Sequence, residues 1–159
     1  MKIMIISDTH RERRNFYKAI EREKPIDLLV HCGDVIGEDA DLAYIAGCKI
    51  EAVAGNMDFH SDLPGEKVFQ IGNYKVFLTH GHLYGANYSE KNLREAGEYE
   101  GADIVMYGHT HIPKITRYGD IVVLNPGSIS FPRQADHKAS YAIMTIDDAG
   151  EAHYEIKYI

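Results

Sequence analysis

The chain has 159 residues, of which 45% are hydrophobic, and its formal net charge is −7 with histidine counted as neutral. A chain of this length is one ordinary domain, and it buries roughly two-thirds of the surface that its unfolded form exposes. The negative charge argues against a protein that binds long nucleic acids, because such proteins neutralise many phosphates with lysine and arginine.

The first part of the chain alternates apolar runs with helical patterns. Three short apolar runs predict strands covered on both faces: residues 2–7, 27–31 and 51–54. Two stretches between them predict helices: residues 13–23 and 38–47. On the first helix, Phe16, Tyr17 and Ile20 form the apolar side. This alternation predicts right-handed βαβ units and a parallel sheet with its ligand site at the carboxyl ends of the strands.

The second part of the chain has the pattern of antiparallel pairs. Three hairpins are predicted: residues 67–71 with 74–79, 115–117 with 121–124, and 141–146 with 152–158. A helix over residues 89–99, with Leu93 and Ala96 inward, and a strand over residues 102–106 lie between the first two hairpins. No linker, repeat or low-complexity segment occurs, so we expect one domain over residues 1–159.

The cysteines and the N-terminal residues indicate the cell compartment. Cys32 and Cys48 lie in or beside apolar runs, which favours reduced thiols over a disulfide framework. The apolar N-terminal run is too short for the core of a signal peptide, and no stretch approaches the roughly 20 apolar residues of a membrane span. We therefore expect a cytoplasmic protein without a membrane partner.

Residues of the types that bind metal ions follow five of the predicted strands. They are Asp8, His10, Asp34, Asn56, His80, His109 and His111. His109 and His111 stand two residues apart, and residues so spaced at a strand end point to the same side. Oxygen and imidazole ligands without a thiolate suit Mn²⁺, Fe²⁺, Co²⁺, Ni²⁺ or Zn²⁺ better than Mg²⁺ or Ca²⁺. We therefore predict a centre of two divalent metal ions, with Mn²⁺ as the first choice.

Each of these residues has an ordinary structural alternative when it is considered alone. Asp8 could cap a helix, and His80 could be a packed histidine. Asp34 and Asn56 could be turn residues that tolerate positive φ. The metal prediction depends on the coincidence of ligand-type residues at five strand ends, most of them beside a glycine that lets backbone and metal approach closely.

Further residues are candidates for contact with a substrate. His82 is expected near the centre, and Ser128 and Arg133 are candidate phosphate contacts, although Arg133 has the alternative of a solvated surface charge. The remaining histidines, which fall within a strand, in loops or in the terminal hairpin, are left outside the predicted centre: His31, His60, His137 and His153.

The motifs, in their order along the chain, resemble those of the calcineurin-like metallophosphoesterase superfamily. The matching series is Asp8-x-His10, Gly33-Asp34, Gly55-Asn56, His80-Gly81-His82 and Gly108-His109-x-His111. The loop Asn125-Pro126-Gly127-Ser128 resembles one in the small prokaryotic phosphodiesterase branch of the superfamily, the YfcE-like proteins. The resemblance leaves only the C-terminal residues 129–159 without a motif.

The resemblance implies an α/β fold in which helices flank a sandwich of two mixed β-sheets. It implies one metal ion held by Asp8, His10, Asp34 and His111, and a second held by Asp34, Asn56, His80 and His109, with Asp34 bridging. Two such ions can share a water as a bridging hydroxide and attract the anionic substrate that the acidic chain would otherwise repel. We therefore predict a phosphodiesterase for a small diester, in which Asn56 and His80 act through the metal centre.

Met57 departs from the pattern of much of the superfamily. Many members have a histidine at this position, thought to steady or protonate the leaving oxygen, and a thioether cannot donate a proton. The YfcE-like branch also lacks that histidine. We therefore expect a small or activated diester rather than esters with poor leaving groups, and the sequence identifies no group that assists the leaving oxygen.

Two other functions use the same features. A phosphomonoesterase or pyrophosphatase would need the same two metal ions. A non-catalytic scaffold would keep the fold for protein binding, as a vacuolar-sorting subunit of the superfamily does, but such a protein would show gaps in the ligand series and this chain shows none. The resemblance is also compatible with a homo-oligomer, although no interface can be identified in the sequence.

Overall fold

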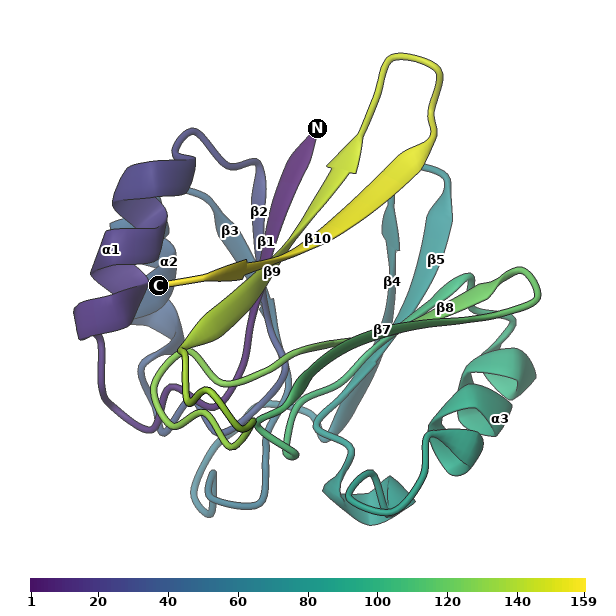
Figure 1. Cartoon of the computed structure of the whole chain (residues 1–159), viewed down its shortest axis with the longest axis horizontal. Helices are drawn as coiled ribbons and strands as arrows, with labels where there is room; N and C mark the ends of the chain where they lie inside the picture. Colours follow the sequence, from purple (N-terminus) through teal and green to yellow (C-terminus); the bar gives the residue numbers. More distant parts are fainter.

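The computed structural model describes residues 1–159 and has four layers (Figure 1). Two five-stranded sheets pack face to face. Helices α1 and α2 cover the outer face of one sheet, and α3 covers the outer face of the other (Figure 1). Both sheets are mixed, so the predicted sandwich of two mixed β-sheets flanked by helices is confirmed.

The first sheet has the strand order β10-β9-β1-β2-β3. Its strands are β1 (Lys2–Ile6), β2 (Leu28–His31), β3 (Lys49–Ala52), β9 (Ser140–Ile146) and β10 (Ala152–Tyr158). Strands β1, β2 and β3 are parallel, whereas β9 is antiparallel to both β1 and β10. Helices α1 (Arg14–Glu23) and α2 (Asp39–Ala46) connect the parallel strands, so the carboxyl ends of β1, β2 and β3 share one edge.

The second sheet has the strand order β4-β5-β6-β8-β7. Its strands are β4 (Glu66–Ile71), β5 (Tyr74–Thr79), β6 (Ile104–Met106), β7 (Pro113–Tyr118) and β8 (Ile121–Pro126). The 3-10 helix η1 (His82–Tyr84) and α3 (Lys91–Glu100) connect β5 to β6. The β4/β5 and β7/β8 hairpins are antiparallel, whereas β6 pairs in parallel with both β5 and β8.

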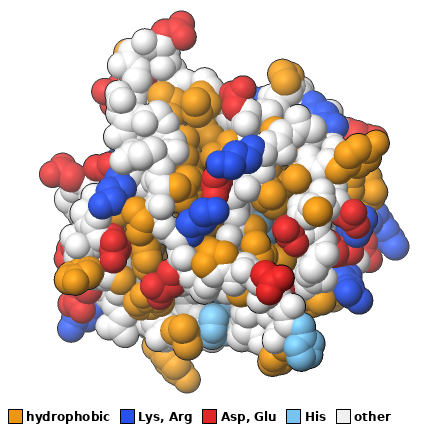
Figure 2. Space-filling model, turned by 180° about the vertical axis from the view of Figure 1, so that it is seen from behind, with side chains coloured by type: hydrophobic (Ala, Val, Ile, Leu, Met, Phe, Trp, Pro, Cys, Tyr) orange, Lys and Arg blue, Asp and Glu red, His pale blue; other side chains and the backbone are white.

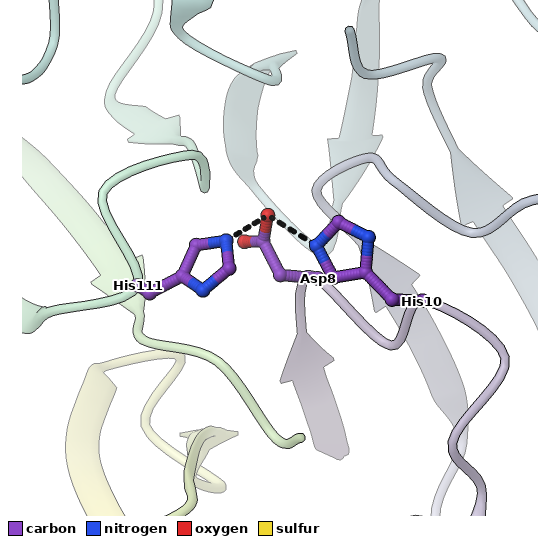
Figure 3. A group of neighbouring side chains, drawn as sticks. All are labelled: Asp8, His10 and His111. Carbon is purple, nitrogen blue, oxygen red and sulfur yellow. Dashed lines mark ion pairs between the residues drawn. The ribbon is translucent and has the colours of Figure 1, made fainter. Parts of the chain in front are cut away.

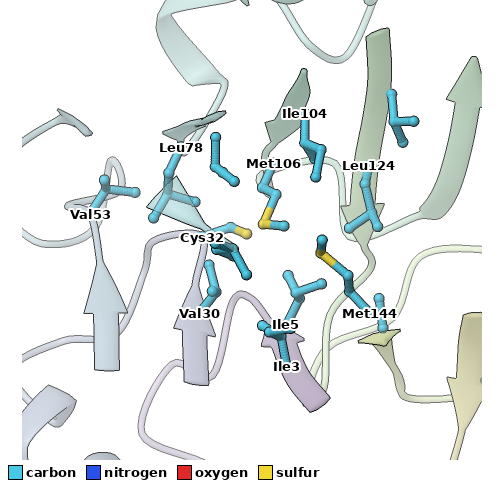
Figure 4. Close-up of a cluster of buried hydrophobic side chains, with 14 residues drawn as sticks. Ile3, Ile5, Val30, Cys32, Val53, Leu78, Ile104, Met106, Leu124 and Met144 are labelled. Atoms are coloured by element: carbon cyan, nitrogen blue, oxygen red, sulfur yellow. The ribbon is translucent and has the colours of Figure 1, made fainter. Parts of the chain in front are cut away.

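The main core lies between the two sheets (Figure 4). Ile3 and Ile5 of β1 pack into it, whereas Met4 and Ile6 of the same strand pack under the helices on the other face. Successive side chains of a strand point to opposite faces, so a strand covered on both faces must be apolar at every position. This explains the uninterrupted apolar run at the start of the chain and fixes the strand that leads to Asp8.

Some sequence expectations about the elements were wrong. Tyr17 is 47% exposed, and Ala19 takes the inward position beside Phe16 and Ile20 on α1. Strand β3 occupies residues 49–52 instead of 51–54, and it pairs with a neighbour on one side only. An edge strand of this kind tolerates the exposed Lys49, so its start carries no apolar signal. The longest helices have ten residues, and no helix could span a membrane.

Candidate metal centre

The loops that follow β1, β2, β3, β5 and β6 meet at one end of the sandwich, the lower end in Figure 1. Backbone hydrogen bonds join them: the amide of Asp8 donates to Gly33 at 3.1 Å, and that of His10 donates to Asp34 at 3.2 Å. The amide of Gly108 donates to the carbonyl of His80 at 3.1 Å, which joins the two loops of the second sheet. All seven candidate ligands predicted from the sequence lie on these loops.

Several of these residues have backbone conformations that residues other than glycine rarely adopt. Positive φ angles occur at Asp8 (55°), His10 (44°), Asp34 (58°), His109 (66°) and His111 (59°). Such conformations cost free energy and persist only where the surrounding structure enforces them, and they cluster at functional sites. The strained backbone therefore makes this end of the sandwich the candidate site.

Asp8 lies between two imidazole rings (Figure 3). Its Oδ1 is 3.0 Å from Nε2 of His111 and 3.8 Å from Nε2 of His10. The Asp8 side chain is fully buried, and its Oδ1 accepts no hydrogen bond. Helix α1 begins at Arg14, so Asp8 does not cap it, and the alternative of a helix cap is excluded.

The carboxylate of Asp34 lies between the imidazoles of two different loops. Its Oδ2 is 3.6 Å from Nε2 of His10 and 3.5 Å from Nε2 of His80. Its Oδ1 accepts the backbone N–H of Met57 at 2.8 Å. One carboxylate oxygen is thus held by the backbone, while the other faces the two rings.

Asn56 stands between the other pair of histidines. Its Oδ1 is 3.1 Å from Nε2 of His80 and 3.1 Å from Nδ1 of His109. On the far side of the His109 ring, Nε2 lies 2.9 Å from the side-chain amide of Asn87. The geometry thus joins Asn56, His80 and His109 in one group, and Asn87 fixes the orientation of the last ring.

Two hydrogen bonds fix which ring nitrogen faces the carboxylates. Nδ1–H of His80 donates to the carbonyl of Cys32 at 2.7 Å, and Nδ1–H of His111 donates to the carbonyl of Phe131 at 2.6 Å. When these two rings are neutral, the other nitrogen of each ring, Nε2, carries a lone pair. The Nε2 atoms of both His80 and His111 face Asp8.

This donor set fits a divalent cation. Lone pairs of imidazole opposite carboxylate oxygens repel one another unless a cation or proton lies between them, and Oδ1 of Asp8 has no other partner. Burial by itself would raise the pKa of Asp8, but positive charge on the facing rings of His111 and His80 lowers it below its ordinary value, so the carboxylate is stabilised when positive charge occupies this space. Two sets have ligand atoms within 4.8 Å of one another: Asp8, His10 and His111, and Asp8, Asp34 and His80.

Two glycines allow the loops to approach this closely. A Cβ atom on Gly55 would overlap the carboxylate of Asp34. A Cβ atom on Gly108 would overlap the hydroxyl of Ser7 and lie 3.0 Å from Oδ2 of Asp8. Both glycines belong to the motifs identified in the sequence, and their role is to leave room for the acidic side chains.

Asp58 is a residue that the sequence reasoning missed. Its carboxylate is buried and accepts the backbone N–H groups of Asp34, Val35, Ile36 and Gly55 at 2.6 to 3.3 Å. It therefore joins the loop after β2 to the loop after β3. No sequence pattern distinguishes a carboxylate that binds backbone amides of a neighbouring loop.

The candidate substrate contacts have different environments. The ring centroid of His82 is 5.3 Å from that of His80 and 6.1 Å from that of His109. Ser128 is fully buried, and its hydroxyl donates to the carbonyl of Asp8 and accepts the amides of Ser130 and Phe131. Ser128 therefore holds the loops together and is not free to contact a substrate.

The histidines left outside the prediction divide into two groups. Fully buried His31 bonds to Thr9, and burial lowers its pKa to about 4. Exposed His153 pairs with Asp147. His60 and His137, by contrast, line two separate hollows near the centre, and Arg133 lines the same hollow as His137.

The chain is similar in sequence and in structure to known proteins. Residues 1–149 match the model of the calcineurin-like phosphoesterase superfamily domain. The chain is 34% identical to a probable metallophosphoesterase, YsnB of Bacillus subtilis, over 93% of this chain and 86% of that protein. It is 30% identical to the phosphodiesterase YfcE of Escherichia coli, over 92% of this chain and 89% of that protein. A crystal structure of a predicted phosphoesterase from Streptococcus pneumoniae matches with a TM-score of 0.79 and 31% identity, covering 99% of this chain and 97% of the other.

Proposed function

The chain belongs to the calcineurin-like phosphoesterase superfamily and is a metal-dependent phosphoesterase, and we propose that it hydrolyses small phosphodiesters with a centre of two divalent metal ions. The observation that carries the proposal is the buried Oδ1 of Asp8, which accepts no hydrogen bond and faces three imidazole nitrogens at 3.0 to 3.9 Å. Such an arrangement is stable when a cation occupies the space between the ligand atoms.

We assign the ligands in two sets that share Asp34. Asp8, His10, Asp34 and His111 would hold one ion, and Asp34, Asn56, His80 and His109 would hold the other. The distances from Asp34 support its bridging role, because its Oδ2 is 3.6 Å from His10 of the first set and 3.5 Å from His80 of the second. Mn²⁺ is our first choice for both sites, and Ni²⁺, Fe²⁺, Co²⁺ and Zn²⁺ are alternatives that suit the same ligands.

Two divalent cations would supply positive charge for the phosphoryl oxygens and lower the pKa of a water toward neutrality. The protein supplies the geometry. Hydrogen bonds to Cys32 and Phe131 hold the rings of His80 and His111 in one orientation, so their Nε2 atoms are aimed before a substrate arrives. His82, at the edge of the centre, is our candidate for contact with a phosphoryl oxygen.

The surroundings of Asn56 favour a diester with a good leaving group. The next residue, Met57, is 42% exposed, and its thioether can donate no proton to a leaving oxygen. Its backbone N–H is already bonded to Asp34. A reaction in which the leaving oxygen departs without a proton is efficient only when that oxygen is a weak base, as in an aryl ester.

The proposal is tested by removing and restoring the metal ions. The purified protein is treated with a chelator, Mn²⁺ or Ni²⁺ is returned, and hydrolysis of an aryl phosphodiester is compared with that of the matching monoester. We expect activity that disappears on chelation, returns with metal and favours the diester in kcat/KM. A preference for the monoester would favour the phosphomonoesterase alternative, and activity that chelation leaves unchanged would contradict the proposal.

Variants add a control for the position of the site. Asn56→Ala and His80→Ala should each lower kcat/KM by about a hundredfold or more, a loss of the size found when one group that stabilises a transition state is removed. His153→Ala changes an exposed histidine whose partner is Asp147, so its activity should equal that of the unmodified protein.

A further inference from the structure

We propose that the hollow beside His10 and His111 binds a flat aromatic group on one arm of the substrate, with the Phe131 ring as its contact surface. The hollow is shallow and wide open to solvent, with a volume of about 740 Å³, which is enough space for one flat ring against its wall. It is lined by His10, His111, Ser130, Phe131, Pro132, Arg133 and His137. This inference names a substrate class for the proposed phosphodiesterase and rests on that function.

The position of the hollow relates it to the chemistry. Two of its lining residues, His10 and His111, are candidate metal ligands whose Nε2 atoms face Asp8. A phosphate held at the centre would therefore direct one of its ester groups into this hollow. A smaller hollow of about 360 Å³, lined in part by Met57 and Phe59, contains none of the candidate ligands.

The segment that carries Phe131 is fixed to the centre. The carbonyl of Phe131 accepts Nδ1–H of His111 at 2.6 Å, and the amide of Arg133 donates to the carbonyl of His111 at 3.1 Å. The amide of Phe131 also donates to the buried hydroxyl of Ser128 at 2.8 Å. These bonds hold the backbone of this segment to a ligand, and a site supported in this way is preorganised.

The Phe131 ring is available to a ligand. It is 51% exposed, although an aromatic ring of this size gains much from burial. Its centroid is 5.5 Å from that of His10, and the two ring planes are nearly perpendicular at 75°. An exposed ring beside a ligand imidazole provides an aromatic surface next to the reacting phosphate.

The charge at the rim of this hollow adds a second feature of the substrate. Arg133 is exposed and forms no ion pair with an acidic residue, although the chain carries a net charge of −7. His137 lies in the same rim. An unpaired guanidinium in an acidic protein favours an anionic or oxygen-rich substituent, so the aromatic group is expected to bind better when it carries a carboxylate.

The test compares two phosphonates that bind without being hydrolysed. Phenylphosphonate and methylphosphonate are measured as inhibitors of the metal-loaded protein acting on one aryl phosphodiester. We expect the phenyl compound to bind roughly tenfold more tightly, the size of one aromatic stacking contact. Phe131→Ala should abolish this preference. Phe59→Ala is the matched control, because Phe59 is 75% exposed in the other hollow, and it should retain the preference.

A binding measurement locates the ring independently of turnover. In ¹H–¹⁵N spectra of metal-loaded protein, with diamagnetic Zn²⁺ as the metal, phenylphosphonate should shift the signals of residues 130–137 and of the Arg133 side chain, and methylphosphonate should leave them almost unchanged. Arg133→Gln should weaken the binding of 4-carboxyphenylphosphonate more than the binding of phenylphosphonate. Adenosine monophosphate tests whether the aromatic group of the substrate is a nucleobase. If Phe131→Ala weakens the binding of adenosine monophosphate, the hollow accepts a nucleobase. If Phe131→Ala weakens the binding of phenylphosphonate alone, the hollow accepts a ring attached directly to the ester oxygen.

The outcomes separate this inference from the proposed function. Equal inhibition by the two phosphonates, in a protein that hydrolyses the diester, would overturn the aromatic subsite and leave the phosphodiesterase intact. Absence of any metal-dependent hydrolysis would contradict the proposed function, and the spectra would still show whether phenylphosphonate contacts residues 130–137. Shifts confined to residues around Phe59 would also overturn the subsite.

Discussion

Met57 occupies the position at which much of the superfamily has a histidine, and it retains a part in the centre through its backbone. Its N–H donates to Oδ1 of Asp34 at 2.8 Å, while its side chain is 42% exposed. The backbone contact is available to any residue except proline, so a change of side chain here leaves the position of Asp34 intact. We therefore expect the absence of a histidine at this position to affect the departure of the leaving group and not the positions of the candidate ligands.

Gly55 provides a test of how closely the ligand loops must approach. A Cβ atom at this position would overlap the carboxylate of Asp34, so Gly55→Ala should displace that carboxylate. Displacement of about 1 Å can lower activity by roughly a hundredfold, and we expect a loss of this size in kcat/KM together with weaker metal binding by calorimetry.

Gly65→Ala is the matched control for this change. A Cβ atom on Gly65 would meet nothing within 4 Å, so the variant should keep full activity and metal affinity. If Gly55→Ala behaved like Gly65→Ala, the tight packing around Asp34 would be unimportant for metal binding.

The residues of the centre differ in how far the sequence could reveal them. The candidate ligands were identifiable because carboxylate, amide and imidazole side chains recur at strand ends beside glycines. Asp58, Asn87 and Phe131 were not identified, since each acts on a residue distant in the sequence: Asp34, His109 and His111 respectively. Contacts of this kind depend on the relative placement of loops, which no local pattern encodes.

Glu90 links secondary-structure elements on the second sheet. Its side chain lies at the start of α3, is almost fully buried and accepts hydrogen bonds from Tyr107 after β6 and from three residues of β7: Lys114, Thr116 and Tyr118. Burial by itself would raise the pKa of Glu90, but Lys114 and the three hydroxyls lower it below its ordinary value. One carboxylate thus fixes α3 against the sheet that supplies His109.

This linkage predicts a pH dependence of stability. Because the pKa of Glu90 is lower in the folded protein, its contribution to the free energy of unfolding is complete well above the ordinary value of 4.5 and decreases as the pH falls through the lower pKa of the folded state. At pH 7, Glu90→Gln should lower the free energy of unfolding by about 2 to 3 kcal/mol, because charged hydrogen bonds are lost. Urea unfolding at pH 7 and pH 3 should show a smaller difference between the two proteins at pH 3.

An exposed glutamate on the same helix serves as the control. Glu95 pairs only with Lys91 on the surface, so Glu95→Gln should change the free energy of unfolding by less than about 0.5 kcal/mol. A difference for Glu90→Gln that stayed constant between pH 7 and pH 3 would show that the carboxylate charge is not what stabilises this linkage.

Strands were predictable from the sequence where both of their faces are buried, and they were less predictable at the edges of the sheets. Strand β1 was found from its apolar run because both of its faces pack against other layers. The predicted range of edge strand β3 begins and ends two residues too late. The short helix η1 could not be predicted, because a three-residue helix has no periodicity. The parallel pairing of β6 with β8 also has no sequence signal, since the hairpin pattern identifies only the antiparallel partners β7 and β8.

In the whole molecule, the two sheets place the loops that carry the candidate ligands at a common end (Figure 1). Carboxylates from the first sheet therefore lie close to imidazoles from both sheets. Figure 2 shows acidic, basic and apolar side chains interspersed on the face seen from behind, with histidines near its lower edge. The chain has a net charge of −7, so bound cations are the means by which it would attract a phosphate. The family and the fold class were predictable because the motifs are distributed over both sheets.

Metal removal should therefore affect the stability of the whole chain. An ion that binds only the folded state stabilises that state by about 2.7 kcal/mol when the concentration of the free ion is a hundred times its Kd. For a chain of this size, 1 kcal/mol corresponds to roughly 2 to 4 °C in Tm, so Mn²⁺ should raise the Tm of the chelated protein by about 5 to 10 °C. Scanning calorimetry measures this shift, and Asp34→Asn should reduce it. An identical Tm with and without Mn²⁺ would argue against a metal site formed by folding.

The proposed metal centre requires that seven side chains from five loops bind two cations together. Anomalous diffraction from a crystal soaked in Mn²⁺ would locate such cations. We predict two peaks about 3.5 to 4 Å apart, with the carboxylate of Asp34 between them. A single peak, or peaks that lie away from Asp34, Asn56 and His80, would show that these side chains do not form a centre of two metal ions.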